Sequence, residues 1–85
     1  YERSRVMNEL LKLNRLEVFP SEANFITVRV PDANELFETL KQNRILIKKL
    51  HGSHPLLDQC VRITIGSAAQ NDAVLAVIKN LYPNL

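Results

Sequence analysis

Two short stretches of alternating side chains constrain the fold of this chain more than any other feature. Residues 24–30 (NFITVRV) and 60–65 (CVRITI) place aliphatic side chains at every second position, which is typical of strands with one buried face. Pro31 ends the first stretch, and Gly66 with Ser67 ends the second. The chain therefore requires a sheet that is covered on one face and open on the other.

Shorter apolar segments and helical periodicity predict the elements that complete such a sheet. In chain order, the expected elements are a helix at 1–14, strands at 16–20 and 24–30, a helix at 33–43, strands at 44–49 and 60–65, and a helix that begins after Ser67 and frays at Pro83. Asp32 with Glu35, and Ser67 with Gln70, have the spacing of capping boxes at the last two helices.

The order α-β-β-α-β-β-α predicts an α+β fold, a two-layer sandwich with the helices packed on one face of a largely antiparallel four-stranded sheet. Eighty-five residues suffice for one domain with one core. A net charge of +2 is too small to indicate nucleic acid or anionic lipid as the partner. No apolar run reaches the roughly 18 residues of a membrane span, and a single cysteine forms no internal disulfide. We expect a cytoplasmic globular domain.

The open face of the predicted sheet carries an unusual mixture of side chains. If the alternating aliphatic residues face the helices, the opposite face carries Arg29, Lys48 and Arg62 beside Phe25 and Leu46. Three cations next to two large apolar side chains are typical neither of a solvated surface nor of a core.

Arg62 is the leading candidate for a binding residue. A guanidinium held on a strand is suited to two parallel hydrogen bonds with a carboxylate or phosphate, and it costs several kcal/mol to withdraw from water without a partner. An internal ion pair with Asp58 or Glu22 explains this residue equally well. Lys48 could supply a second cation for the same anion, although the pattern favours a solvated lysine at the end of a strand.

Other residues with reactive side chains carry weaker signals. His51 and His54 lack a third ligand, so a loop is favoured over a zinc site. Cys60 has no activating histidine beside it, which favours a packed thiol. The start of the last helix could bind an anion, but capping already explains its residues. Without a glycine-rich phosphate loop, nucleophile elbow or paired acid and base, we expect no catalytic residue in this chain.

Several motifs, taken in order, resemble the C-terminal small domain of histidinol-phosphate aminotransferase, a family of pyridoxal-phosphate enzymes with the aspartate-aminotransferase fold. These motifs are PSEANF at 20–25, the cationic strand end at 48–49, CVRITIG at 60–66 and an asparagine soon after Ser67. The resemblance covers essentially the whole chain. It implies that residues 1–14 are the end of the helix between the large and small domains, and that residues 15–85 are the small domain.

The resemblance implies that Arg62 binds the anionic end of the substrates, namely the carboxylate of glutamate and the phosphate-bearing substrate. Lys48 stands where many members have an arginine that assists with phosphate, and lysine lacks the planar fork. Asn24 matches a family residue with a minor role in lining the site. The cofactor, pyridoxal 5'-phosphate, would be bound mainly by the large domain, which would also carry the Schiff-base lysine. The fragment alone should therefore be inactive.

The parent enzyme implied by the resemblance transfers an amino group between L-glutamate and imidazole-acetol phosphate in histidine biosynthesis. Its expected partners are the large domain of the same chain, glutamate and histidinol phosphate, in a homodimer without nucleic acid or membrane. The alternatives are a stand-alone regulatory module that binds an amino acid and the small domain of another aminotransferase or decarboxylase of this fold. An RNA-binding sheet is disfavoured because Phe25 is the only aromatic residue on the open face.

Overall fold

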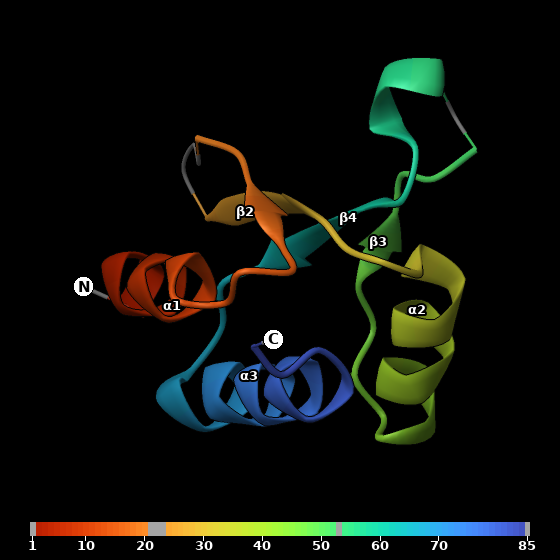
Figure 1. Ribbon diagram of the computed structural model, residues 1–85. Helices are drawn as coiled ribbons and strands as arrows, with labels where there is room; N and C mark the ends of the chain where they lie inside the picture. Colours follow the sequence, from red (N-terminus) through yellow and green to blue (C-terminus); the bar gives the residue numbers. More distant parts are fainter. Residues whose placement is uncertain (1, 21–23, 53, 85) are drawn as a thin grey trace.

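The computed structural model describes residues 2–20, 24–52 and 54–84, which form three α-helices, one 3₁₀ helix and a four-stranded sheet. The elements are α1 (Glu2–Leu11), β1 (Glu17–Val18), β2 (Phe25–Arg29), α2 (Ala33–Gln42), β3 (Lys48–Lys49), η1 (Pro55–Leu57), β4 (Cys60–Thr64) and α3 (Ala68–Leu81). All three α-helices lie on one side of the sheet (Figure 1). The predicted two-layer α+β sandwich is confirmed.

The sheet has the strand order β1-β2-β4-β3, and each neighbouring pair is antiparallel. The two alternating strands, β2 and β4, pair with each other in the middle. Their alternation sends Ile26, Val28, Val61 and Ile63 into the core beneath the helices. Burying each such side chain stabilises the fold by about 1.5–3 kcal/mol. The remaining side chains of β2 and β4 therefore lie on the other, open face of the sheet.

The strand predicted at 44–49 is wrong over its first four residues, because only Lys48 and Lys49 pair with β4. Arg44 has a φ of 62°, which turns the chain sharply after α2, and the amide of Ile45 still bonds to a carbonyl of that helix. The alternation of burial nevertheless persists, since Ile45 is partly buried while Leu46 is 77% exposed. The helix predicted at 1–14 likewise ends earlier, at Leu11.

Both predicted helix starts are present, but only one of the two predicted capping boxes has both of its hydrogen bonds. At α3 the capping box is complete, because Ser67 Oγ accepts a bond from Gln70 N and Gln70 Oε1 accepts one from Ser67 N. At α2 the carboxylate of Asp32 accepts a bond from the amide three residues on. A residue from the loop before β4, Gln59, bonds the first amide of α2 through its side-chain oxygen at 2.6 Å. No helix within the described ranges is both long and apolar enough to cross a membrane.

Candidate functional site

Arg62 lies on β4, between two neighbouring strands and on the face opposite the helices. The register places Thr27 of β2 on one side of it and Lys48 of β3 on the other. Directly opposite residues on paired strands have Cβ atoms about 4.5–5.5 Å apart, and two like charges so placed repel each other. This pair of cations is therefore stabilised when an anion binds to both.

The guanidinium of Arg62 lies against an aromatic ring, and no carboxylate of residues 2–20, 24–52 and 54–84 neutralises it. Its Cζ atom lies 4.5 Å from the centre of the Phe25 ring. Its Nε atom is buried and has no hydrogen-bond partner in the described part of the chain. Such a contact with an aromatic ring is worth about 0.5–2 kcal/mol, whereas an unsatisfied buried donor costs about 1–3 kcal/mol and more when charged. The ring therefore orients Arg62, but the Nε–H group of this residue still lacks an acceptor among the described residues.

No carboxylate within the described parts of the chain pairs with Arg62, so the alternative of an ion pair with Asp58 is excluded. Asp58 instead lies beside His51, and its backbone oxygen accepts a bond from Arg29. The other proposed partner, Glu22, lies outside the described residues.

Arg29, the arginine of β2, is occupied by internal partners. It donates to Asp58 O at 2.9 Å, to Leu56 O at 2.8 Å and to Glu17 Oε1 at 2.7 Å. The hydrogen bond with Glu17 raises the pKa of this guanidinium. Arg29 therefore fastens the 3₁₀ segment and β1 to the sheet, and it is not available to a ligand.

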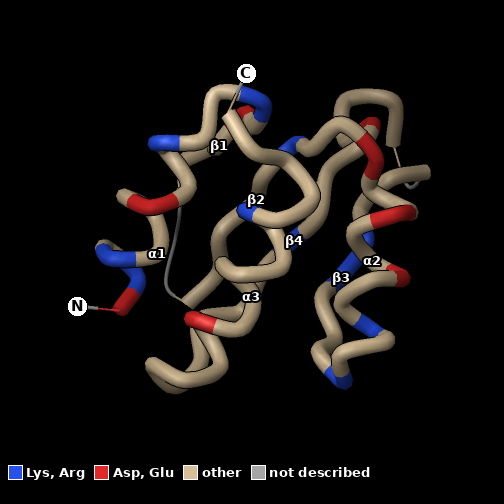
Figure 2. Tube along the Cα trace, turned by 60° about the horizontal axis from the view of Figure 1, so that its bottom comes forward, with Lys and Arg blue, Asp and Glu red and all other residues tan. Residues whose placement is uncertain are grey.

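The three strands β2, β3 and β4 carry basic residues and no acidic ones. Figure 2 shows these basic positions (blue) in the sheet, whereas the helices carry both acidic (red) and basic positions. Lys48 is exposed, whereas its neighbour Lys49 donates to Asn34 and lies over the ring of Phe37. Lys48 is thus the lysine of β3 that lies directly beside Arg62 in the register.

Asn24, the third predicted site residue, precedes β2 directly. Its backbone oxygen accepts a bond of 2.7 Å from Ile65 N, and the residue is exposed. Its position beside Phe25 brings it close to the site, and its contact with substrate stays a prediction. Sequence reasoning missed the role of Phe25. Alternation places Phe25 on the open face, but the strand register that sets it diagonally against Arg62 was not readable from the sequence.

The two histidines of the loop have structural partners. His51 Nδ1 accepts a bond from Gln59 N at 2.9 Å, and His54 Nδ1 accepts one from Leu56 N at the start of η1. Because His51 Nδ1 is an acceptor, its 3.1 Å contact with Asp58 is not an ion pair through that atom. The described residues contain no group of three potential metal ligands. Cys60 is buried, as predicted for a packed thiol.

A groove of about 280 Å³ lies at the end of β4, beyond the two residues of β3. Its walls come from residues 44–47, from Ile63 and Thr64, and from the start of α3. Arg62 does not line it. The groove is therefore separate from the basic face described above.

Comparisons with known proteins identify the family of this chain. Residues 1–78 match the model of the family "Aminotransferase class I and II". Over 81 residues the chain is 72% identical to a histidinol-phosphate aminotransferase of Neisseria gonorrhoeae (strain NCCP11945) and 53% identical to one of Chromobacterium violaceum. These matches cover 95% of this chain but 23% of each relative, so the chain spans about a quarter of their length.

Solved structures of related enzymes share the fold of this chain. The histidinol-phosphate aminotransferase of Clostridium acetobutylicum superposes with a TM-score of 0.83 at 30% identity, over 99% of this chain and 26% of that one. An L-threonine-O-3-phosphate decarboxylase of Porphyromonas gingivalis superposes with a TM-score of 0.82 at 26% identity, over 94% of this chain and 26% of that one. The family match over most of the sequence, together with this fold, shows that the chain belongs to the class I and II aminotransferases.

Proposed function

We propose that this chain is the substrate-clamping part of a histidinol-phosphate aminotransferase. The parent enzyme transfers an amino group between L-glutamate and imidazole-acetol phosphate in histidine biosynthesis. The relatives at 72% and 53% identity, which are named histidinol-phosphate aminotransferases, support this assignment. The observation that carries the binding role is the guanidinium of Arg62, which Phe25 holds on the open face and which no described carboxylate neutralises. We further propose a cytoplasmic, homodimeric parent, on the family resemblance alone.

The geometry accommodates both kinds of anionic tail. A carboxylate accepts two parallel hydrogen bonds from a guanidinium fork, and Phe25 holds the plane of that fork. A phosphate carries about −1.5 to −2 charges near pH 7, so it gains more than a carboxylate does from a second cation. Lys48, in register with Arg62, supplies that cation. Asn24 contributes a polar wall at the end of β2.

The cofactor of the parent is proposed to be pyridoxal 5'-phosphate, which acts as an electron sink for the substrate when it is bound. The aromatic face nearest to Arg62 belongs to Phe25 and is already covered by the guanidinium. These residues therefore fit the anionic tail of a substrate better than the ring of a cofactor. Their contribution is to bind that tail and orient the amino group, which lowers the entropic cost of the reaction.

Substitution of Arg62 by alanine in the full-length parent tests this function. Losing a charged hydrogen bond costs about 1.5–3 kcal/mol, so kcat/KM for glutamate should fall by roughly 10- to 150-fold. Arg29→Ala is the matched control, because it removes the same charge from the same face where the guanidinium is already bonded internally. Unchanged kinetics in Arg62→Ala, or an equal loss in Arg29→Ala, would refute the role.

A decarboxylase of the same fold is the second candidate. The structural match to an L-threonine-O-3-phosphate decarboxylase favours it, because a phosphate-bearing ligand also fits Arg62 beside Lys48. The two candidates are separated by incubating the parent with glutamate and imidazole-acetol phosphate, and separately with phosphorylated amino acids. Formation of 2-oxoglutarate supports the aminotransferase, whereas release of carbon dioxide without amino transfer supports the decarboxylase.

A further inference from the structure

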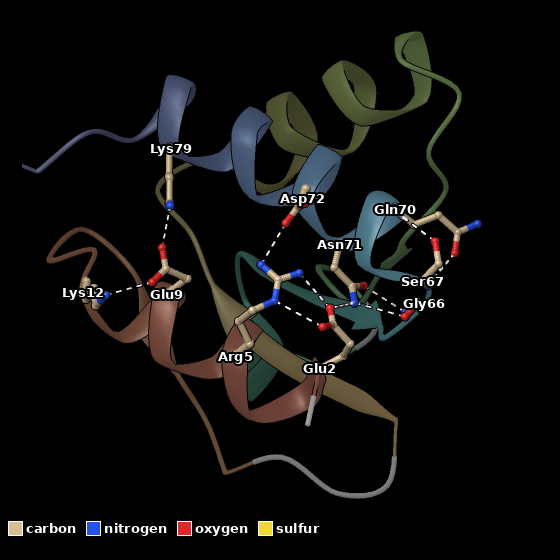
Figure 3. Close-up of polar contacts among 10 residues, drawn as sticks. All are labelled: Glu2, Arg5, Glu9, Lys12, Gly66, Ser67, Gln70, Asn71, Asp72 and Lys79. Carbon is tan, nitrogen blue, oxygen red and sulfur yellow. Dashed lines mark hydrogen bonds and ion pairs between the residues drawn. The ribbon is translucent and has the colours of Figure 1, made fainter.

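Asn71 is the buried polar side chain of the described core, with 3% of its surface exposed. Its Oδ1 accepts a bond from Gly66 N at 2.9 Å, and its Nδ2 donates to Gly66 O at 3.0 Å and to Glu2 Oε1 at 2.9 Å (Figure 3). Both amide hydrogens are used, so the side chain is fixed in one orientation. One buried amide thus joins α1, α3 and the turn that follows β4.

The backbone of Gly66 is held on both sides by this amide. The preceding residue, Ile65, donates its N–H to Asn24 O at 2.7 Å, one step beyond the last pair of the β2–β4 ladder. Asn24 leads directly into Phe25, whose ring lies against the guanidinium of Arg62. A continuous series of contacts therefore runs from Asn71 to the ring that orients Arg62.

Glu2 of α1 also holds the side chain of Asn71 in place. Its carboxylate also accepts two bonds from Arg5, which in turn donates to Asp72 of α3 at 2.8 Å. The bonds from Arg5 and then Asn71 lower the pKa of Glu2, so this carboxylate stays ionised as an acceptor. The Asn71 amide is therefore held by a charged partner as well as by the turn.

We propose that Asn71 is a positioning residue for Arg62. It fixes the end of β4, and through the Ile65–Asn24 bond it keeps Phe25 against the guanidinium. This inference rests on the proposed function, in which Arg62 binds the anionic end of the substrate. In addition to holding α1 and α3 together, the buried amide of Asn71 therefore affects the affinity for substrate.

The structure provides a matched control in the contact between Glu9 and Lys79. This ion pair of 2.7 Å joins the same two helices, α1 and α3, without contact to Gly66 or β4 (Figure 3). Glu9→Ala therefore weakens the association of the helices while leaving the end of the strand clamped. A purely structural role of Asn71 predicts that both variants behave alike.

The test uses the full-length parent, with Asn71→Ala, Glu2→Ala and Glu9→Ala compared with wild type. In Asn71→Ala, amide hydrogen exchange in peptides containing Ile65 should accelerate about fivefold or more, because two bonds to the turn are lost. KM for glutamate should rise about three- to tenfold with kcat within about twofold, since orientation of a binding group is lost. Glu9→Ala should change neither the exchange rate at Ile65 nor KM.

Glu2→Ala removes the charged partner of the Asn71 amide, so hydrogen exchange at Ile65 should accelerate about two- to threefold. This variant provides the test if Asn71→Ala does not fold. Exchange at Ile65 equal to wild type in Glu2→Ala and in any folded Asn71→Ala protein overturns the proposal. Equal changes in Glu9→Ala also overturn it, as does an unchanged KM for glutamate in a folded Asn71→Ala protein whose exchange at Ile65 is accelerated. Hydrogen exchange is measured without substrate, so it tests the role of Asn71 independently of substrate binding. The proposed function is tested separately by the kinetics of Arg62→Ala.

Discussion

Replacement of Tyr82 by phenylalanine is expected to destabilise the fold by a small amount that depends on pH. Tyr82 ends α3 with 2% of its surface exposed, and its hydroxyl donates to Asp32 O at 2.8 Å. That oxygen also accepts a bond from Leu36 N, so it keeps a partner when the hydroxyl is removed. Because phenylalanine preserves the ring, the cost at pH 7 should be that of one hydrogen bond, about 0.5–1.5 kcal/mol.

The pH dependence provides the sharper test. Burial, with the nearby Glu35 carboxylate as the next cause, raises the pKa of Tyr82 from 10.0 to about 12. A raised pKa means that the stabilisation is complete below pH 10 and is lost as the pH rises from 10 to 12. The phenylalanine variant lacks this loss, so the stability curves of the two proteins should cross between about pH 10 and 11.

Urea unfolding followed by circular dichroism, at intervals from pH 7 to pH 11, measures both effects. Lysines and the other tyrosine titrate in both proteins, so the difference between the two curves isolates Tyr82. Equal stability at pH 7 would refute the contribution of the hydrogen bond. Parallel curves from pH 9 to pH 11 would refute the raised pKa of this residue.

Other perturbations have equally definite expected outcomes. Hydrogen bonds from Lys12 and Lys79 lower the pKa of Glu9 from 4.5 to about 2, so its stabilisation is lost as the pH falls through this interval. The stability difference between wild type and Glu9→Gln, from urea unfolding, should therefore shrink between pH 5 and pH 2. A methyl group at Gly66 would collide with Gln70 Oε1. Gly66→Ala should thus cost about 0.5–1 kcal/mol in wild type but nothing in a Gln70→Ala background, and equal costs in both would contradict this contact.

Local patterns were sufficient to predict most of the elements of this fold. The alternation in β2 and β4 determines which side chains are buried, because successive residues of a strand point to opposite faces. Helix starts were readable because Asp32, Ser67 and Gln70 act on amides within three residues of themselves. The extent of β3 was not readable, because its pairing with β4 begins only at Lys48, four residues after the turn at Arg44.

The sequence by itself determined that an arginine would stand on the open face of the sheet, and its resemblance to a known family indicated a binding role. Only the tertiary structure decided what surrounds that arginine. The register brings Lys48 beside Arg62, diagonal packing sets Phe25 against its guanidinium, and Asn71 clamps the turn after β4. These contacts join residues that are far apart along the chain, and pairing between distant segments depends on how the whole core packs.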